Sequence, residues 1–118
     1  MPPRQTHFER GYCPGFQAAV ELIGRRWSGA ILLAMLSGAE RYSQIGASVP
    51  GLSDRLLAER LREFVDAGLA VRNVLDEQPV AVRYRLTDKG ATLAPVVREL
   101  LEWSHRWRLE AAGEGADP

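Results

Sequence analysis

The chain has 118 residues, of which 46% are hydrophobic and 25% are charged, as is typical of a single globular domain. No apolar run reaches the roughly 18 residues of a membrane span, and residues 1–12 lack the apolar segment of a signal peptide, so we expect a cytoplasmic protein. The single cysteine, Cys13, excludes an internal disulfide and a multi-cysteine metal site, and we expect no cofactor.

The first predicted helix follows a flexible arm over residues 1–12. Pro14 suits the first position of a helix and Cys13 suits the cap position before it. Apolar residues then recur at helical spacing as far as Gly24, which we expect to end the helix. A second helix is predicted from about Trp27 to Leu36.

Two helices joined by a tight turn are predicted between Arg41 and Leu69. We expect Ser43 to cap a short helix that the Val-Pro-Gly sequence at 49–51 breaks. Ser53 then caps the second helix, because its hydroxyl can accept a hydrogen bond from an otherwise unpaired N–H, and Gly68 can end it in a left-handed conformation. This arrangement is typical of proteins that place a helix in the major groove of DNA.

A β-hairpin is predicted directly after these helices, with strands over residues 69–75 and 82–86 and a turn between them. In the second strand apolar residues alternate with Arg83 and Arg85, which predicts a half-buried strand with a basic outer face. A hairpin in this place indicates the wing of a winged helix.

A long, strongly apolar helix is predicted from its cap, Thr87, to Trp107. A small domain cannot bury so much apolar surface by itself, so we expect the first helix of a second copy to cover it. The predicted fold is therefore mainly α with a small β-hairpin (α+β), a winged helix-turn-helix at 13–108 that dimerises through its N- and C-terminal helices, before a disordered tail at 109–118. The predicted dimer contacts are Phe16, Val96, Leu100, Trp103 and Trp107.

One face of the second helix of this pair is the candidate DNA-reading surface. On a helical wheel centred on Leu57, the residues Leu61 and Phe64 fall within about 40° and face the core. Arg55 and Arg62 fall on the opposite side, and arginine suits guanine and phosphate. The candidate base contacts are Ser53, Asp54, Arg55, Ala58, Glu59 and Arg62, and the candidate backbone contacts nearby are Arg41, Ser43 and Arg83.

Two observations weigh against DNA binding. Fifteen basic residues balance fifteen acidic ones, whereas DNA-binding domains are often basic. A row of charges on one helix is also commonly just a solvated face with ordinary ion pairs. The alternatives are a winged-helix module for protein association, which would need an apolar face in place of Arg55 and Arg62, and a thiol enzyme, for which Cys13 has no obvious partner.

The chain resembles the HxlR-type winged helix-turn-helix transcriptional regulators, relatives of the MarR type, from Cys13 to Trp107. The resemblance rests on an ordered set of short motifs, which are CP at 13–14, LIGRRW at 22–27, RY at 41–42, GLS at 51–53, RL at 60–61, GL at 68–69 and LTDKG at 86–90. It implies a homodimer that binds a pseudo-palindromic operator with its two recognition helices one helical turn apart. Because a small dimer on a promoter blocks access to it, repression is the expected outcome.

The position of Cys13 has a further implication within this family. Some members sense oxidants, quinones or aldehydes through a cysteine near the N-terminus, and Cys13 matches that position. The positive end of a helix favours the reactive thiolate, although a structural cysteine buried under the dimer interface is an open alternative. Trp27, Trp103 and Trp107 are expected to be packing anchors, or else to line a small-molecule effector pocket at the dimer seam.

Overall fold

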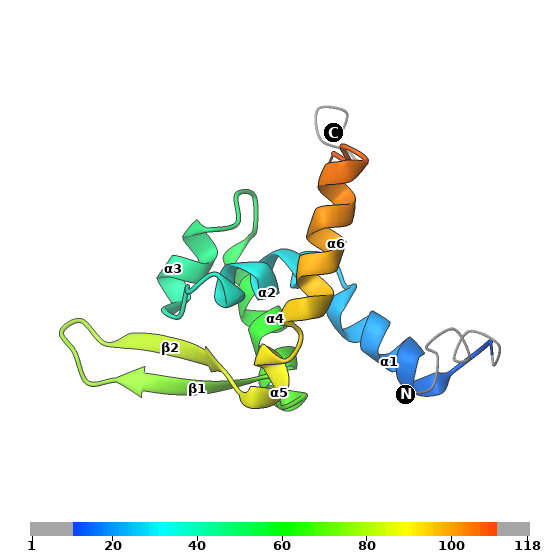
Figure 1. The fold of residues 1–118 in the computed structure, drawn as a ribbon. Helices are drawn as coiled ribbons and strands as arrows, with labels where there is room; N and C mark the ends of the chain where they lie inside the picture. The colour runs from blue at the N-terminus through cyan, green and yellow to red at the C-terminus, as the bar shows by residue number, and fades with distance from the viewer. Residues whose placement is uncertain (1–10, 111–118) are drawn as a thin grey trace.

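The computed structural model describes residues 11–110, so most of the predicted arm and tail lies outside the described residues. The elements in chain order are α1 (Pro14–Ile23), α2 (Ser28–Leu36), α3 (Tyr42–Ala47), α4 (Asp54–Asp66), β1 (Ala70–Leu75), β2 (Ala81–Leu86), α5 (Asp88–Ala91) and α6 (Ala94–Arg106) (Figure 1). This mainly helical chain with one antiparallel hairpin confirms the predicted fold class, and the elements follow the predicted order up to the end of the hairpin.

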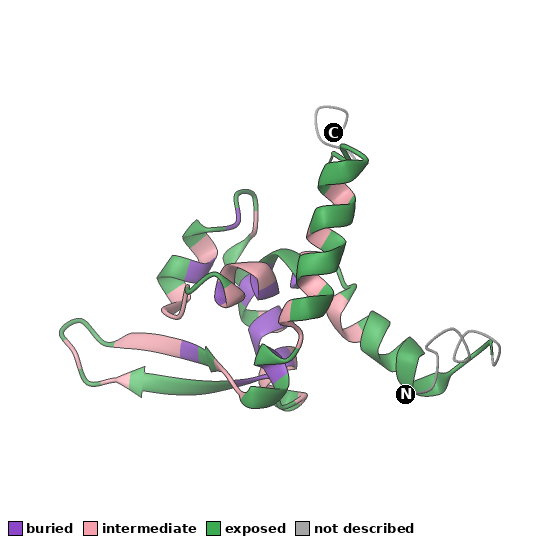
Figure 2. Cartoon of the chain, viewed as in Figure 1, coloured by how far each residue is buried: buried purple, intermediate pink, exposed green. Residues whose placement is uncertain are grey.

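The hydrophobic core lies where α2, α3 and α4 meet the base of the hairpin (Figure 2). Phe64 and Leu61 of α4 are fully buried there, as are Ile31 and Leu32 of α2. Tyr84 of β2 is also buried, which fixes the base of the hairpin to the helices. The apolar positions that the wheel assigned to the core side of α4 are therefore confirmed.

The hairpin projects from this core as a two-stranded ribbon (Figure 1). Its strands pair antiparallel from Ala70 opposite Leu86 to Leu75 opposite Ala81. A single further bridge joins β2 to the residue before α3, and the N–H of Tyr84 donates to the carbonyl of Glu40 at 2.7 Å. The base of the wing is thus attached to the segment that leads into the helix-turn-helix.

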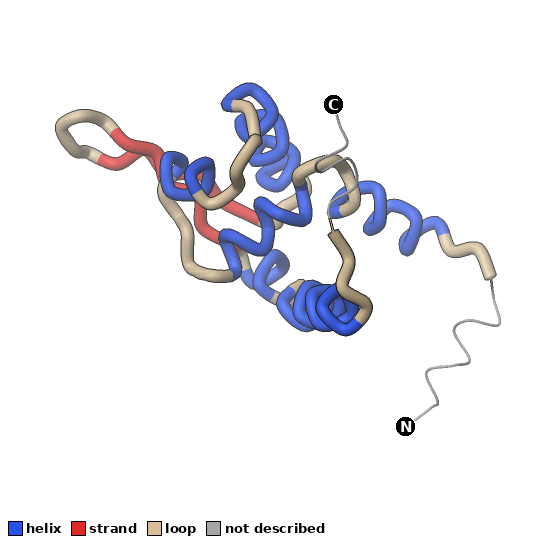
Figure 3. The backbone as a smooth tube through the Cα atoms, turned by 90° about the horizontal axis from the view of Figure 1, so that it is seen from above, coloured by secondary structure: helices blue, strands red, loops and turns tan. Residues whose placement is uncertain are grey.

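The helices α1 and α6 extend from the body and contain no fully buried residue, although Leu22, Ile23 and Val97 pack partly against the core. Figures 1 and 3 both show α1 and the hairpin directed to opposite sides of the core. Large apolar side chains on both helices are exposed, including Phe16 at 68% and Leu100 at 62%, as is Trp107 at 64% directly after α6. Exposed apolar surface of this extent is typical of surfaces that bind another molecule.

The prediction that Ser43 caps the short helix is wrong, because α3 already begins at Tyr42 and its cap residue is Arg41. Arg41 is extended, since it forms a bridge with Arg83, and the helix begins immediately after it. The Oε1 atom of Gln44 accepts from the N–H groups of Arg41 at 3.1 Å and of Glu40 at 3.3 Å, so a glutamine satisfies the start of the helix.

The prediction of one long helix starting at Thr87 is also wrong. Thr87 caps only the single turn α5, where its Oγ1 accepts from the N–H of Gly90 at 3.2 Å. The long helix starts separately at Ala94. The interruption has a local cause, because Pro95 has no N–H and its ring would meet the carbonyl of Ala91 in a continuous helix, whereas proline is tolerated in a first turn.

Candidate nucleic-acid interface

Helix α4 is fixed at both ends, which positions its outer face. The Ser53 Oγ accepts from the N–H of Leu56 at 3.1 Å, so the predicted cap is confirmed. At the other end Gly68 has a left-handed φ of 79°, as predicted, and the Lys89 Nζ donates to the carbonyl of Ala67 at 2.7 Å. Both ends of the helix therefore have partners for backbone groups that would otherwise be unpaired.

The outer face of α4 is open to solvent. Arg55, Ala58 and Arg62 are exposed, and the side chain of Arg55 is 83% exposed. Glu59 lies between the arginines, with its Oε2 at 3.8 Å from the Arg55 Nη1. Four of the six candidate base contacts, Arg55, Ala58, Glu59 and Arg62, thus lie on one accessible face, and Glu59 is placed to orient Arg55.

Asp54 is engaged by a residue that the sequence interpretation missed. The hydroxyl of Tyr42 lies 2.9 Å from the Asp54 Oδ1 and 3.1 Å from its carbonyl oxygen, so it can donate to either. Burial and this hydrogen bond raise the pKa of Tyr42 to about 12. The contact ties α3 to the start of α4 and so fixes the angle of the helix-turn-helix.

Arg41 is held by an acidic residue in the hairpin turn. Its Nη1 and Nη2 lie 3.0 Å and 2.7 Å from the two carboxylate oxygens of Glu77, which makes a bidentate ion pair. The pair raises the pKa of Arg41 and lowers the pKa of Glu77, mainly through the hydrogen bonds. Ser43 is exposed beside them, at a hollow of about 400 Å³ between α3 and the wing.

Arg83 and Arg85 of β2 differ in their surroundings. Arg85 is exposed, as expected for a basic outer face, whereas the Arg83 side chain is only 36% exposed and its Nε lies 4.0 Å from the Glu40 carboxylate. Arg41 and Arg83 are therefore beside each other at the junction of α3 and the wing, each with an acidic neighbour.

Arg60 is a third arginine of α4, but its side chain is only 8% exposed. It points to the opposite side of α4, where its Nε donates to the carbonyl of Arg26 at 2.9 Å. The wheel contained the signal for this, because Arg60 lies only about 60° from Leu57, on the core side of the helix. The exposed positive charge of α4 therefore comes from Arg55 and Arg62.

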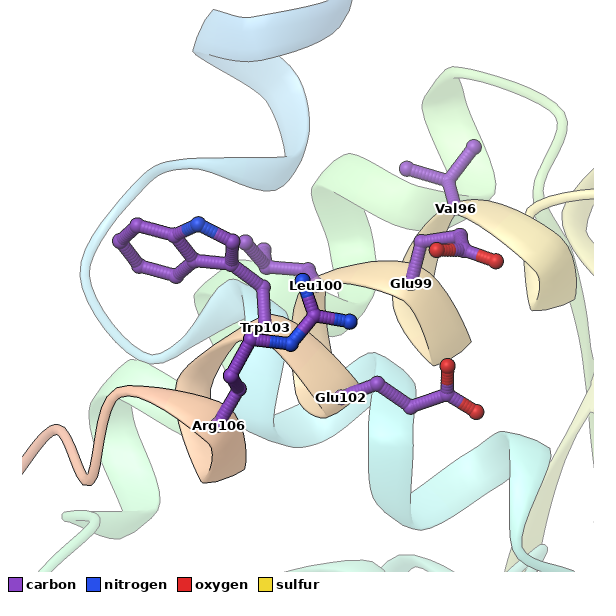
Figure 4. Close-up of a pocket in the computed structure, with 6 residues that line it drawn as sticks. All are labelled: Val96, Glu99, Leu100, Glu102, Trp103 and Arg106. Carbon is purple, nitrogen blue, oxygen red and sulfur yellow. The ribbon is translucent and has the colours of Figure 1, made fainter.

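Cys13 precedes the first residue of α1, at the end of the helix that points away from the core. Its Sγ accepts from the N–H of Phe16 at 3.4 Å, which confirms its position as the helix cap, and the residue is exposed in the protomer. The predicted dimer contacts on α6 are also exposed, and Figure 4 shows three of them with their polar neighbours Glu99, Glu102 and Arg106. An apolar groove of about 410 Å³ runs between α1, α2 and α6.

Residues 11–110 contain no group of three or more His, Cys, Asp or Glu side chains that could hold a metal ion, and no helix among them has the length and hydrophobicity of a membrane span.

Known proteins resemble the chain over most of its length. The family model for the HxlR-like helix-turn-helix matches residues 22–112. The uncharacterized HTH-type transcriptional regulator YvaP of Bacillus subtilis is 43% identical over 80% of this chain and 88% of its own length. The reduced form of the transcriptional regulator YodB from B. subtilis superposes with a TM-score of 0.70 and 38% identity, over 80% of this chain and 93% of that one.

The redox regulator HypR in its oxidized form gives a TM-score of 0.73 at 30% identity, over 85% of this chain and 100% of that one. The family and these relatives are transcriptional regulators and not enzymes. The open face of α4, the wing beside it and these similarities lead to one assignment: the chain belongs to the HxlR family of helix-turn-helix transcriptional regulators.

Proposed function

We propose that this regulator is a repressor that binds a pseudo-palindromic operator as a homodimer. The observation that carries the proposal is the open face of α4, on which Arg55 and Arg62 are exposed and Ser53 caps the end that would enter the groove. An arginine on such a face can donate two hydrogen bonds to one guanine, to its O6 and N7 atoms. Arg41, before α3, and Arg83, in the wing, lie beside each other where they would meet the adjacent DNA backbone.

The apolar surface of α1 and α6 supports the homodimer. Val96, Leu100 and Trp103 are 50%, 62% and 48% exposed on α6, and Phe16 is 68% exposed on α1. The groove between α1, α2 and α6 could receive an apolar helix of a second copy. A dimer through these helices would present two copies of α4, as a pseudo-palindromic operator requires.

DNA binding is tested by measuring the affinity for the DNA upstream of the protein's own gene, with random DNA as competitor. Arg55→Ala and Arg62→Ala should each weaken specific binding by about tenfold or more, since a bidentate base contact contributes about 1–3 kcal/mol. Arg98→Ala is the matched control, because this exposed arginine belongs to α6 and not to α4, and it does not line the apolar groove between α1, α2 and α6. Wild-type affinity in both α4 variants would refute the reading surface.

We also propose that oxidation of Cys13 releases the operator, and that a small-molecule effector at the dimer seam could act in the same way. HypR, a similar structure, is a redox regulator, and Cys13 is exposed at the start of α1. Since the chain has one cysteine, a disulfide would join Cys13 of two copies or Cys13 and a small thiol. Two thiols would lose two protons and two electrons, which diamide accepts as it is reduced to the hydrazine.

This response is tested by titrating the operator with protein before and after treatment with diamide. The oxidised wild type should lose affinity, dithiothreitol should restore it, and Cys13→Ser should bind equally under all three conditions. Unchanged operator binding by wild-type protein whose thiol is fully consumed would rule out redox control through Cys13.

A further inference from the structure

The link between α1 and α2 consists of residues 24–27, which we call the elbow. Gly24 caps α1, the Ser28 N–H donates to the carbonyl of Arg25 at 2.9 Å, and Trp27 has a left-handed φ of 76°. This conformation is unfavourable for a residue with a bulky side chain, so surrounding contacts must maintain it. Only the last turn of α1, with Leu22 and Ile23, packs against the core, and no residue of α1 is fully buried. The direction in which α1 leaves the body therefore depends strongly on the elbow (Figure 1).

Arg60 of α4 binds the backbone of this elbow. Its guanidinium donates from Nε to the carbonyl of Arg26 at 2.9 Å, and its Nη1 lies 3.1 Å from the Glu63 Oε2 and 3.5 Å from the Glu59 Oε1. The Nη1 of Arg25, in the elbow, lies 3.6 Å from the same Glu63 oxygen. One buried guanidinium therefore joins the backbone of the elbow to two carboxylates of α4.

The elbow also contacts the turn before α4. The Trp27 side chain packs against the hydrophobic core, and its ring lies so close to Gly51 that a Cβ atom there would be 3.4 Å from the Cη2 atom. The elbow is thus connected to the turn that leads into α4 and, through Arg60, to the middle of the helix. Glu59, one of the carboxylates bound by Arg60, also pairs with Arg55 on the outer face of α4.

We propose that Arg60 is a positioning residue that fixes the direction of α1 relative to α4. The consequence for DNA binding rests on the proposed function. In the proposed dimer, the direction of α1 sets the distance between the two α4 helices, and this distance sets the spacing of the half-sites that the dimer binds. Arginine suits this role because its planar fork donates from Nε and Nη1 in different directions. Lysine could keep an ion pair with Glu63, but it has no second nitrogen for the carbonyl of Arg26.

The direction of α1 is tested by a spin-label distance between Cys13, at the start of α1, and a cysteine introduced at the exposed Ala47, at the end of α3. Labelled chains are mixed with an excess of unlabelled Cys13→Ser protein, so that only distances within one chain are measured. Arg60→Lys and Arg60→Met should shift or broaden the distance distribution. Arg62→Met, an exposed neighbour on the same helix, should leave it as in the wild type.

The lysine variant separates positioning from simple loss of stability. It retains the positive charge, and its folded state is checked by circular dichroism and by a cooperative unfolding transition. Wild-type distance distributions in both folded Arg60 variants would overturn the proposal. This measurement needs no DNA, so it can fail or succeed independently of the proposed operator binding.

Half-site spacing provides a second readout that a merely structural role would not change. Operators with the same half-sites and spacers of different lengths are ranked for the wild type and for Arg60→Lys. The variant should lose preference for the wild-type spacer, with a several-fold smaller difference between spacers, while each half-site keeps its sequence preference. An identical ranking in the two proteins would overturn the link between Arg60 and spacing.

Discussion

Arg41 and Glu77 form a two-point ion pair between the start of α3 and the turn of the hairpin. The sequence predicts Arg41 as a phosphate ligand, and that role stays a prediction. In the free protein its guanidinium already binds a carboxylate, so a phosphate would have to share it with Glu77 or displace Glu77. The pair also anchors the turn of the wing to the helix-turn-helix, which nothing in the spacing of the two residues along the chain indicates.

The Arg41–Glu77 pair makes the free energy of unfolding depend on pH in the acidic range. Because Arg41 lowers the pKa of Glu77, the carboxylate contributes stability above the ordinary glutamate pKa of about 4.3, and this contribution is lost as the pH falls through the lower folded value. Glu77→Gln should therefore be less stable than the wild type at pH 7, and the two should converge in strong acid. Urea unfolding across this pH range measures the difference.

The control for this prediction is the same substitution in an Arg41→Gln background. There Glu77→Gln should change the free energy of unfolding little at any pH, because its partner is absent. A difference between wild type and Glu77→Gln that persists undiminished below the glutamate range would show that the ion pair is not its source.

At the scale of whole elements, cap and turn residues predicted most helix starts and ends. They failed where a contact with another element also acts on the backbone at that position. The Ser53 cap and the left-handed Gly68 delimit α4 as predicted. Ser43 is a good cap residue by type, but the bridge between Arg41 and Arg83 places the start of α3 earlier. A suitable cap residue therefore predicts the start of a helix only where pairing with another element does not already fix the backbone before that helix.

The two serines provide a matched test of capping. Ser53→Ala should lower the free energy of unfolding by about 1 kcal/mol, because the N–H of Leu56 loses its acceptor. Ser43→Ala, inside α3 and exposed, should change it by less than about 0.5 kcal/mol. Chemical denaturation of both variants measures the two values, and equal losses would contradict the assignment of a single cap.

At the scale of the molecule, the chain has a small core and two helices, α1 and α6, with no fully buried residue of their own. The wing and α1 extend to opposite sides of that core. This shape separates the surface proposed to read DNA from the apolar surface proposed to form the dimer. The elbow connects these two surfaces, and Arg60 joins the elbow to α4 through its hydrogen bond to the carbonyl of Arg26.

Self-association should depend on the apolar residues of α6. Trp103→Ala should weaken dimerisation by about 30-fold, because a large side chain at the centre of an interface contributes about 2 kcal/mol or more. Arg98→Ala, also exposed on α6, should dimerise as the wild type does. Sedimentation equilibrium measures both constants, and a wild-type chain that stays monomeric at high concentration would refute the proposed homodimer.

The sequence by itself determined the order of helices, the position of the hairpin and the polar face of α4. These depend on periodicity, caps and turn residues, which act over a few residues. Exposure of Arg55 and Arg62 and burial of Leu57 and Phe64 follow from the same periodicity.

Only the tertiary structure decided which charged residues are free. Glu77 binds Arg41 across 36 positions of the chain, and Arg60 reaches the carbonyl of Arg26 across 34. Tyr42 contacts Asp54 from the neighbouring helix. Such contacts depend on how elements pack against one another, and side-chain type and local spacing do not encode that packing. For this reason the sequence could predict the exposed face of α4 that is proposed to read DNA, whereas the residues that hold this face in position emerged only from the fold.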